Sequence, residues 1–217
     1  MRNILITGAA NGLGRALLEH YAKEEDKNRI FAVDVSWPNK ANAHDHCAAT
    51  TAANNISYHK TDITSEPDLE TLVKTLESAG VSKLDLVINS AGIRGLISND
   101  PASSSATINQ SSDVAKAETL QVMTTATLLR TFEVNAVGTF QLAALNAIVK
   151  SLVIDVADVC FVTVHPGRVA TALCNGVRED NAMEPEEVLP SLIALVEGCS
   201  LADSGRYVDR FGEDIGW

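Results

Sequence analysis

A glycine-rich turn between an apolar strand and a helix, at the start of the chain, constrains the fold more than any other feature. Residues 3–7 form a short apolar run, three glycines lie within residues 8–14, and an amphipathic helix is expected over about 13–25. Glycines at such a turn let the chain reverse tightly, let the helix pack on the strand and let the backbone approach a pyrophosphate. The N–H groups of the helix N-terminus then attract phosphates. The alternative is a plain tight turn.

The rest of the chain alternates short apolar runs with longer amphipathic stretches. Further strands are expected at residues 30–35, 56–59, 84–89 and 159–164, and further helices at residues 66–79 and 186–197. Strands that are apolar on both faces and alternate with helices are typical of a parallel sheet covered on both sides. The pattern therefore predicts an α/β protein with a Rossmann-like, doubly wound parallel sheet. We expect residues 1–217 to form one domain, with residues 98–122 as a mobile loop insertion.

The charge of the chain argues against several classes of partner. Acidic residues outnumber basic ones by 28 to 17, for a formal net charge of −11. A nucleic-acid-binding protein needs a basic face, and an anionic membrane surface would repel this chain. No apolar run approaches the length of a membrane span, and the first strand begins too early to leave room for a signal peptide. We therefore expect a cytoplasmic protein with no nucleic-acid or membrane partner.

The cysteines and histidines give no sign of a metal or a disulfide framework. The four cysteines are scattered, which suits reduced thiols in the cytosol: Cys47, Cys160, Cys174 and Cys199. The run His44-Asp45-His46-Cys47 has metal-binding residue types, but they cannot all face one ion from a regular helix. We expect this run to be a polar loop and no metal to be bound.

An acidic residue stands at the end of the second expected strand. Asp34 follows Gly14 by 20 residues, where a carboxylate can accept hydrogen bonds from the ribose hydroxyls of an adenosine. Its charge would repel a 2′-phosphate, and no arginine follows it, because Val35 and Ser36 come next. The sequence therefore predicts NAD as the cofactor in preference to NADP. The alternative for Asp34 is a solvated carboxylate at a strand end.

The pattern TGxxxGxG at residues 7–14 resembles the short-chain dehydrogenase/reductase family. Other segments resemble that family in the same order along the chain. Asp62-Ile63 resembles its adenine contact, and residues 89–92 resemble its NNAG segment. Residues 132–138 resemble the helix that carries its structural and catalytic Asn, and residues 165–171 resemble the Pro-Gly segment that closes over the nicotinamide. The ending at 204–217 resembles the C-factor-like and sniffer-type carbonyl reductases. The resemblance implies NAD(P)-dependent oxidoreduction of a small carbonyl or alcohol substrate.

The resemblance also implies the site residues. Asn135 is the expected catalytic residue. The expected cofactor-binding residues all lie in the motifs above: Gly8, Asn11, Gly12, Leu13, Gly14, Asp34, Asp62, Ile63, Asn89, Ala91, Gly92, Pro166, Gly167 and Thr171. Members of the family often pair through two helices near the active site, so a homodimer is one alternative to a monomer.

The resemblance fails where the proton-transfer chemistry should be. The family protonates the forming alkoxide with a Tyr that a Lys four residues later makes more acidic, beside a Ser. Here the three tyrosines, Tyr21, Tyr58 and Tyr207, are followed at that distance by Glu25, Asp62 and Phe211. The matching segments are joined directly between Leu142 and Ala143. A strand–helix unit of roughly 30–45 residues is therefore expected to be missing.

This gap has structural and functional consequences. Residues 128–157 are expected to form one helix, and the strands at 84–89 and 159–164 must either pair directly or leave a gap. Three explanations stay open: an incomplete or mis-spliced gene model, a non-catalytic dinucleotide-binding sensor or scaffold, or a replacement acid such as His165 or the serines at 103–105. As general acid catalysis contributes roughly 10²–10⁴-fold, we expect negligible dehydrogenase turnover from this chain.

Overall fold

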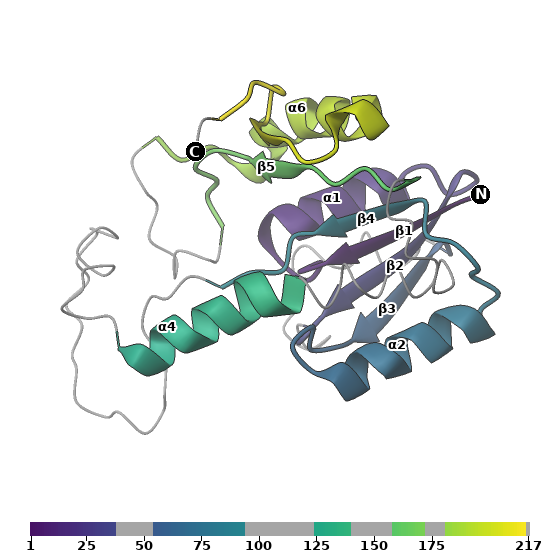
Figure 1. Cartoon of the computed structure of the whole chain (residues 1–217). Coiled ribbons are helices and arrows are strands. Elements are labelled where there is room, and N and C mark those ends of the chain that lie inside the picture. Colours follow the sequence, from purple (N-terminus) through teal and green to yellow (C-terminus); the bar gives the residue numbers. More distant parts are fainter. Residues whose placement is uncertain (38–53, 94–123, 140–157, 172–180, 216–217) are drawn as a thin grey trace, which may run out of the picture.

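The computed structural model describes residues 1–37, 54–93, 124–139, 158–171 and 181–215 (Figure 1). Its first half is built around a four-stranded sheet. The strands are β1 (Arg2–Thr7), β2 (Asn28–Asp34), β3 (Ile56–Lys60) and β4 (Leu86–Asn89), in the spatial order β3-β2-β1-β4. Every pairing in this sheet is parallel. The predicted Rossmann-like α/β fold is confirmed.

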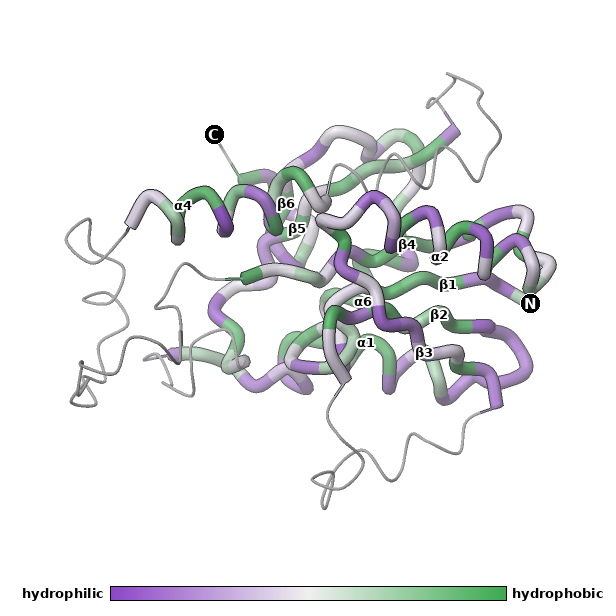
Figure 2. The backbone as a smooth tube through the Cα atoms, turned by 90° about the horizontal axis from the view of Figure 1, so that it is seen from below, coloured by the Kyte–Doolittle hydropathy of each residue, from purple (hydrophilic) through white to green (hydrophobic). Residues whose placement is uncertain are grey.

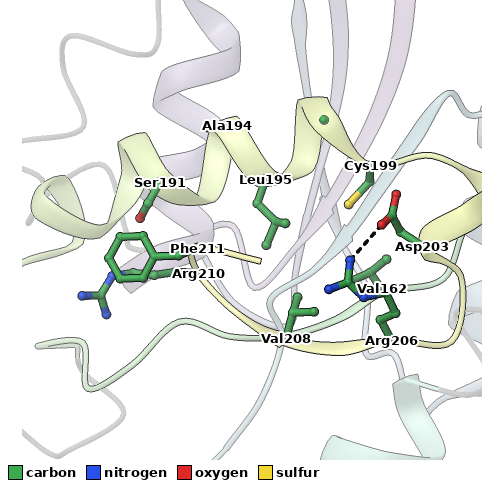
Figure 3. A pocket seen from close by; sticks show the side chains of 11 residues that line it. Val162, Ser191, Ala194, Leu195, Cys199, Asp203, Arg206, Val208, Arg210 and Phe211 are labelled. Carbon is green, nitrogen blue, oxygen red and sulfur yellow. Dashed lines mark hydrogen bonds and ion pairs between the residues drawn. The ribbon is translucent and has the colours of Figure 1, made fainter. Parts of the chain in front are cut away.

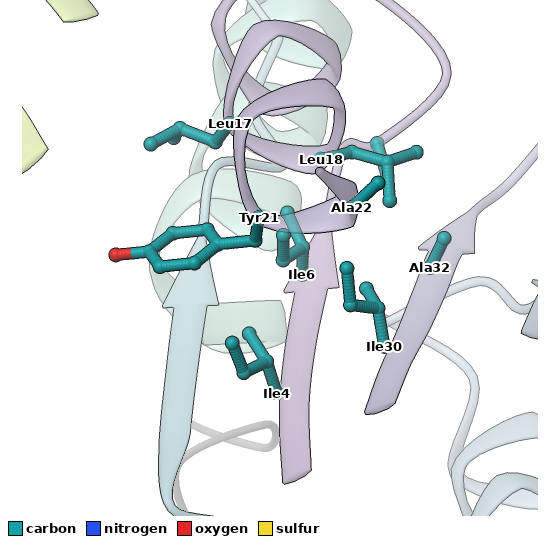
Figure 4. Packing of buried hydrophobic residues seen from close by; sticks show 9 residues of the cluster. Ile4, Ile6, Leu17, Leu18, Tyr21, Ala22, Ile30 and Ala32 are labelled. Atoms are coloured by element: carbon teal, nitrogen blue, oxygen red, sulfur yellow. The ribbon is translucent and has the colours of Figure 1, made fainter. Parts of the chain in front are cut away.

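Helices cover both faces of this sheet. On one face, α1 (Gly12–Ala22) contributes Leu17, Leu18, Tyr21 and Ala22 to a buried cluster with Ile4, Ile6, Ile30 and Ala32 (Figure 4). On the other face, α2 (Glu66–Ser78) contributes Leu69, Leu72 and Leu76 to a cluster with Leu5, Phe31 and Val33. Successive side chains of a strand point to opposite faces, so Ile4 and Leu5 belong to different clusters. In Figure 2 these central strands carry long hydrophobic stretches, in keeping with burial on both sides.

Local signals explain where the first two helices begin and end. The Ser65 hydroxyl accepts a hydrogen bond from the N–H of Asp68 at 3.4 Å, and Pro67 stands in the first turn, so α2 begins at Glu66 as predicted. α1 ends at Ala22, earlier than predicted. Beyond it the chain turns, because the N–H of Lys27 bonds to the carbonyl of Glu24 at 3.0 Å.

The C-terminal residues form a second, smaller sheet. β5 (Thr163–His165) pairs in parallel with β6 (Tyr207–Asp209). Between them the chain forms α6 (Pro185–Gly198) and the short 3₁₀ helix η4 (Leu201–Asp203). α6 lies against α1, where Leu189 and Ile193 join the cluster that α1 forms with the large sheet.

The two sheets are not joined by strand pairing within the described residues. The strands predicted at 84–89 and 159–164 were expected either to pair directly or to leave a gap. The structure has the gap, because β4 and β5 belong to different sheets. The strand expected at 159–164 is also shorter and shifted. β5 begins at Thr163 because its partner β6 begins at Tyr207, the residue in register with it. A strand cannot extend beyond the partner that supplies its hydrogen bonds.

The helix expected over 128–157 begins earlier than predicted. α4 (Thr125–Phe132) starts at Thr125 because the Thr124 hydroxyl accepts a hydrogen bond from the N–H of Thr127 at 3.1 Å. It continues as a π-helix, η1 (Glu133–Gly138). Residues 140–157, with the junction between Leu142 and Ala143, lie outside the described residues, as does the loop expected over 98–122.

Candidate functional site

The glycine turn between β1 and α1 is too crowded for larger residues. Gly8 has a φ of +65°, and a Cβ built on it would lie 2.7 Å from the carbonyl oxygen of Ser90. A Cβ on Gly14 would collide with the carbonyl oxygen of Gly8. Asn11, the N-cap residue of α1, makes no capping hydrogen bond with its side chain. The first N–H groups of α1 are therefore not capped by Asn11 and can serve an anionic ligand.

Asp34 reaches this turn from the end of β2. Its Oδ2 accepts a hydrogen bond from the N–H of Ala10 at 3.0 Å, and its Oδ1 accepts one from the N–H of Ser36 at 3.2 Å. The residue is half-buried. The carboxylate is thus held against the glycine turn, where a ligand on the turn would meet its negative charge.

Hydrogen bonds connect the carboxyl ends of β1 and β4. The hydroxyl of Thr7 donates to Oδ1 of Asn89 and accepts from the N–H of Ala91 at 3.2 Å. Nδ2 of Asn89 donates to the hydroxyl of Thr139 at 2.8 Å. Thr7 was not among the predicted site residues, although it ends the first strand and directly precedes Gly8. This network fixes the segment with Asn89 and Ala91 beside the glycine turn.

Asn135 lies on the π-helix η1 and holds the chain that follows β4. Its Oδ1 accepts a hydrogen bond from the N–H of Ile93 at 2.8 Å, and its Nδ2 donates to the carbonyl of Ile93 at 2.7 Å. A Cβ on Gly92 would lie 3.4 Å from the same Oδ1. A π-helical turn inside a helix is frequently found at functional sites. Asn135 therefore contacts Gly92, and Asn89 is linked to the same helix through Thr139.

Asp62 follows β3, and its carboxylate already has partners. Oδ1 accepts hydrogen bonds from the N–H and hydroxyl of Thr64 at 2.9 and 2.7 Å, and Arg130 of α4 lies 3.7 Å from Oδ2. Burial pushes the pKa of Asp62 upward, but the Thr64 hydrogen bonds and the Arg130 charge outweigh it and lower the pKa below its ordinary value. The Ile63 side chain is buried, and a Cβ on Gly138 would lie 2.9 Å from it. Arg130 is a site neighbour that no sequence motif indicated.

The segment after β5 crosses to the glycine turn. Pro166 and Gly167 follow β5 directly, and Gly167 has a φ of +89°. Further along, a Cβ on Gly12 would lie 3.1 Å from both Cβ and Cγ2 of Thr171. Thr171 therefore lies over Gly12 at the start of α1, although β5 and β1 belong to different sheets.

These residues gather at the topological switch point of the large sheet. From β1 the chain moves to β2 and β3 on one side and then returns to β4 on the other. Gly8 and Ser90 meet at the carboxyl ends of β1 and β4, between those two branches. Ligands of open α/β sheets bind in the crevice at this point. The carboxyl edge at Gly8 and Ser90 is therefore the candidate ligand site.

The sequence profile described as "short chain dehydrogenase" matches residues 2–173, a range that includes every residue of the candidate site. The chain belongs to the short chain dehydrogenase family. The resemblance read from the motifs is thereby confirmed. The family and its nicotinamide-bound structural relatives support a dinucleotide-dependent oxidoreductase.

Relatives of this short chain dehydrogenase match over nearly their whole length. The short chain dehydrogenase gsfK of Penicillium aethiopicum is 23% identical over 256 residues, which cover 99% of this chain and 98% of that protein. The NADPH-bound carbonyl reductase from chicken fatty liver has a TM-score of 0.75 at 15% identity, covering 100% of this chain and 99% of the other. The putative carbonyl reductase Sniffer of Caenorhabditis elegans has a TM-score of 0.63 at 15% identity, with both chains fully covered. A 4-hydroxyisoleucine dehydrogenase complexed with NADH also has a TM-score of 0.63 at 15% identity, covering 98% of each chain.

Two tyrosines of this short chain dehydrogenase have other partners. The Tyr21 hydroxyl donates to Oε1 of Glu197 at 2.8 Å, and burial, followed by Glu197, raises the pKa of Tyr21. The Tyr58 ring packs edge-on against Trp37, with ring centroids 5.0 Å apart. His165, one candidate replacement acid, is the exposed last residue of β5, whereas the serines at 103–105 lie outside the described residues.

Two negative findings concern the described ranges alone. None of the helices there is long and apolar enough to span a bilayer. Nor does that part of the chain contain a group of three or more His, Cys, Asp or Glu side chains able to hold a metal ion. The run from His44 to Cys47 falls outside it.

Proposed function

We propose that this chain binds a nicotinamide adenine dinucleotide along the carboxyl edge of the large sheet, as an oxidoreductase-family protein for small carbonyl or alcohol substrates. The contact of Thr171 with Gly12 carries the proposal. It shows that the segment after β5 still reaches the glycine turn even though β4 and β5 are not paired. This contact supports a dinucleotide site with one wall from the glycine turn and the other from the segment after β5.

The residues fit the parts of such a cofactor. The crowded glycine turn with Gly8, Gly12 and Gly14 and the N-terminus of α1 suit the pyrophosphate. Asp62, with the backbone of Ile63, would lie on the adenosine side. Asn89, Ala91 and Gly92 on one side and Pro166, Gly167 and Thr171 on the other would flank the nicotinamide ribose and ring. The nicotinamide ring, when bound, supplies or accepts the hydride, and the protein orients it.

We infer a preference for NAD over NADP from Asp34. Its carboxylate is fixed at the turn by Ala10 and Ser36, so it stands where it can accept the ribose hydroxyls and repel a 2′-phosphate. The related structures named above carry either NADPH or NADH, so family membership alone leaves both cofactors open.

We further propose that the chain binds cofactor but reduces carbonyl compounds negligibly. No Tyr in the sequence has a Lys four residues later, so no tyrosine has the family's partner for donating the proton. The alignment with the Penicillium relative runs over 256 residues and covers almost all of both proteins, whereas this chain has 217 residues. That difference supports the loss of one strand–helix unit of roughly 30–45 residues.

Titration of the full chain with NADH and NADPH, followed by their fluorescence, tests binding, and a parallel assay with a reactive ketone tests turnover. Saturable NADH binding without ketone reduction is expected. Ketone reduction that the G14A variant abolishes would refute the loss of activity. Failure of the wild-type chain to bind either nucleotide would refute the cofactor proposal. Sequencing the transcript across the codons of Leu142 and Ala143 separates a mis-spliced gene model from a natural loss, because only the first would reveal an encoded YxxxK.

A homodimer through α4 is a second proposal. Leu128, Leu129 and Phe132 are 56%, 62% and 62% exposed, and no residue of α4 is buried within the described structure. The helix projects from the large sheet (Figures 1 and 2). Sedimentation analysis should give a dimer that Leu129→Glu dissociates. Leu201→Glu, a matched change at another exposed leucine, should leave the dimer intact. A wild-type monomer at micromolar concentration would refute the proposal.

A further inference from the structure

Two cysteines outside the cofactor site interact near the end of α6, and one of them, Cys199, lines a pocket beneath that helix. The pocket, of about 350 Å³, lies between α6 and β6, and its lining includes Cys199, Val162 and Asp203. Figure 3 shows the Cys199 thiol directed into this pocket from the end of α6, near Asp203 and Val162. Cys199 is the C-cap residue of α6 and is half-buried.

The backbone places Cys160 on the same face as Val162. Residues 160–162 precede β5, and Phe161 is held to the turn after η4: its N–H donates to the hydroxyl of Ser204 at 3.2 Å and its carbonyl accepts from the N–H of Gly205 at 2.7 Å. Exposure alternates over these residues, since Cys160 and Val162 are half-buried and Phe161 is exposed, so Cys160 and Val162 face one side and Phe161 the other. Val162 lines the pocket, whereas Phe161 is 41% exposed. Cys160 therefore faces the end of α6.

A single short turn connects the two cysteines. Cys199 leads into η4, and η4 leads to Ser204, which bonds the residue after Cys160. Asp203 fixes that turn by accepting hydrogen bonds from the N–H and hydroxyl of Ser200 at 3.0 and 2.9 Å. Burial, and then the charge of Asp203, raises the pKa of the Cys160 thiol, and the pKa of Cys199 is raised by burial, by Cys160 and by Asp203. The carboxylate of Asp203 thus raises the pKa of both thiols.

We propose that Cys160 and Cys199 form a disulfide when the protein meets a peroxide. One thiolate attacks the peroxide oxygen and becomes a sulfenic acid, releasing hydroxide. The other thiol then displaces water from that sulfur to form the S–S bond. In total, two thiols lose two electrons and two protons, and one hydrogen peroxide becomes two waters. Because both thiols are protonated at neutral pH, the first step is slow.

The bond would join the end of α6 to the start of β5 and close a loop that contains the segment from Pro166 to Thr171. Closing a loop restricts the unfolded chain and stabilises the folded one. Oxidation is therefore expected to raise the melting temperature by several degrees. The proposal does not depend on cofactor binding, so it can fail or succeed separately from the proposed function.

The test treats the full-length chain with hydrogen peroxide and measures intact mass and free thiols. We expect a loss of 2 Da, a fall from four titratable thiols to two, and a cross-linked proteolytic fragment containing Cys160 and Cys199. C160S and C199S should each abolish the 2 Da loss, whereas C47S and C174S should retain it. A 2 Da loss that survives C160S, a cross-link to Cys47 or Cys174, or addition of oxygen without any cross-link would overturn the proposal. The wild-type fragment map gives the answer even where a variant does not fold.

Discussion

The carboxamide of Asn135 forms a two-bond ring with the backbone of Ile93, accepting from its N–H at 2.8 Å and donating to its carbonyl at 2.7 Å. Asparagine suits this position because its amide has a donor and an acceptor side by side. The ring attaches the segment after β4 to the π-helix, and Asn89 adds a second link through Thr139 at 2.8 Å. The segment that we propose to flank the nicotinamide is therefore held by a side chain that the family resemblance singled out for catalysis.

Replacing Asn135 should loosen this segment. Asn135→Ala removes both hydrogen bonds and is expected to lower the free energy of unfolding by about 1–2 kcal/mol and to weaken NADH binding. Asn135→Asp keeps an acceptor but turns a carboxylate oxygen toward the Ile93 carbonyl, so it should not restore stability. Urea denaturation and fluorescence titration measure the two effects. Asn54→Ala, the same change at an exposed asparagine in the turn before β3, is the control and should change neither; an unaltered Asn135→Ala protein would contradict the prediction.

Substitution of Gly14 by alanine tests how closely the glycine turn is packed. Alanine is normally better than glycine inside a helix by up to about 1 kcal/mol. At Gly14, however, the added methyl would collide with the carbonyl oxygen of Gly8, so G14A should destabilise the protein and abolish NADH binding. At Gly198 an added Cβ meets nothing within 4 Å, so G198A should be neutral or slightly stabilising. Thermal unfolding and NADH titration of G14A and G198A measure these effects. Equal melting temperatures and equal NADH affinities of the two variants would count against a crowded turn.

Periodicity alone was sufficient to predict the large sheet. The run at Ile4, Leu5 and Ile6 is apolar at every position, and its residues divide between clusters on the two faces of the sheet. The glycines, Asp34 and Asn135 carry motifs that locate the carboxyl edge. The apolar run and these motif residues are local features of the sequence, so they can be predicted without knowledge of the fold.

The partners of these residues could not be predicted, because they depend on contacts between distant segments. Thr7 joins Asn89 across 82 positions, and Arg130 reaches Asp62 from α4. The start of β5 was also misjudged, since an apolar run does not reveal where its partner strand begins. β6 is only three residues long, and its first residue, Tyr207, determines where β5 begins.

Glu197 should make stability depend on pH in the acid range. It accepts hydrogen bonds from Arg2 and Tyr21, each at 2.8 Å, and so joins β1, α1 and α6. Burial raises its pKa, but these hydrogen bonds outweigh that effect and lower the pKa below its ordinary value of 4.5. A carboxyl whose pKa is lower in the folded state stabilises the fold above its unfolded pKa, and this stabilisation is lost as the pH falls through the folded pKa.

Glu197→Gln should therefore flatten the loss of stability below about pH 4.5, which urea titrations at several pH values would reveal. Glu24→Gln is the control, because Glu24 pairs with Lys27 at a surface where both side chains are more than half exposed. That variant should follow the wild-type curve. If the two variants shared one pH profile, the contacts of Glu197 would not be the cause.

His59 should add a second pH dependence nearer neutrality. Within the part of the chain that the structure describes, its buried Nε2 has no hydrogen-bond partner, and burial lowers the pKa of His59 below its ordinary value of 6.5. The unfolded chain then takes up the proton first, so stability should fall as the pH drops below about 6.5. His59→Gln should remove this slope between pH 7 and 5, whereas His20→Gln should preserve it. A slope present in both variants would assign the effect to another group.

The choice between NAD and NADP should depend on the charge of Asp34. In the wild-type protein the N–H of Ala10 donates to Oδ2 of Asp34 at 3.0 Å. Asp34→Asn keeps an oxygen that can accept this hydrogen bond but removes the charge that would repel a 2′-phosphate. The ratio of the Kd for NADPH to the Kd for NADH should fall by about tenfold, equivalent to about 1.4 kcal/mol. Asp26→Asn changes the net charge equally at an exposed turn before β2, at the opposite end of that strand, and should leave the ratio unchanged. Because the ratio compares two ligands on one protein, a general loss of folding cannot imitate the effect, and an Asp34→Asn ratio equal to the wild-type ratio would remove Asp34 from the discrimination.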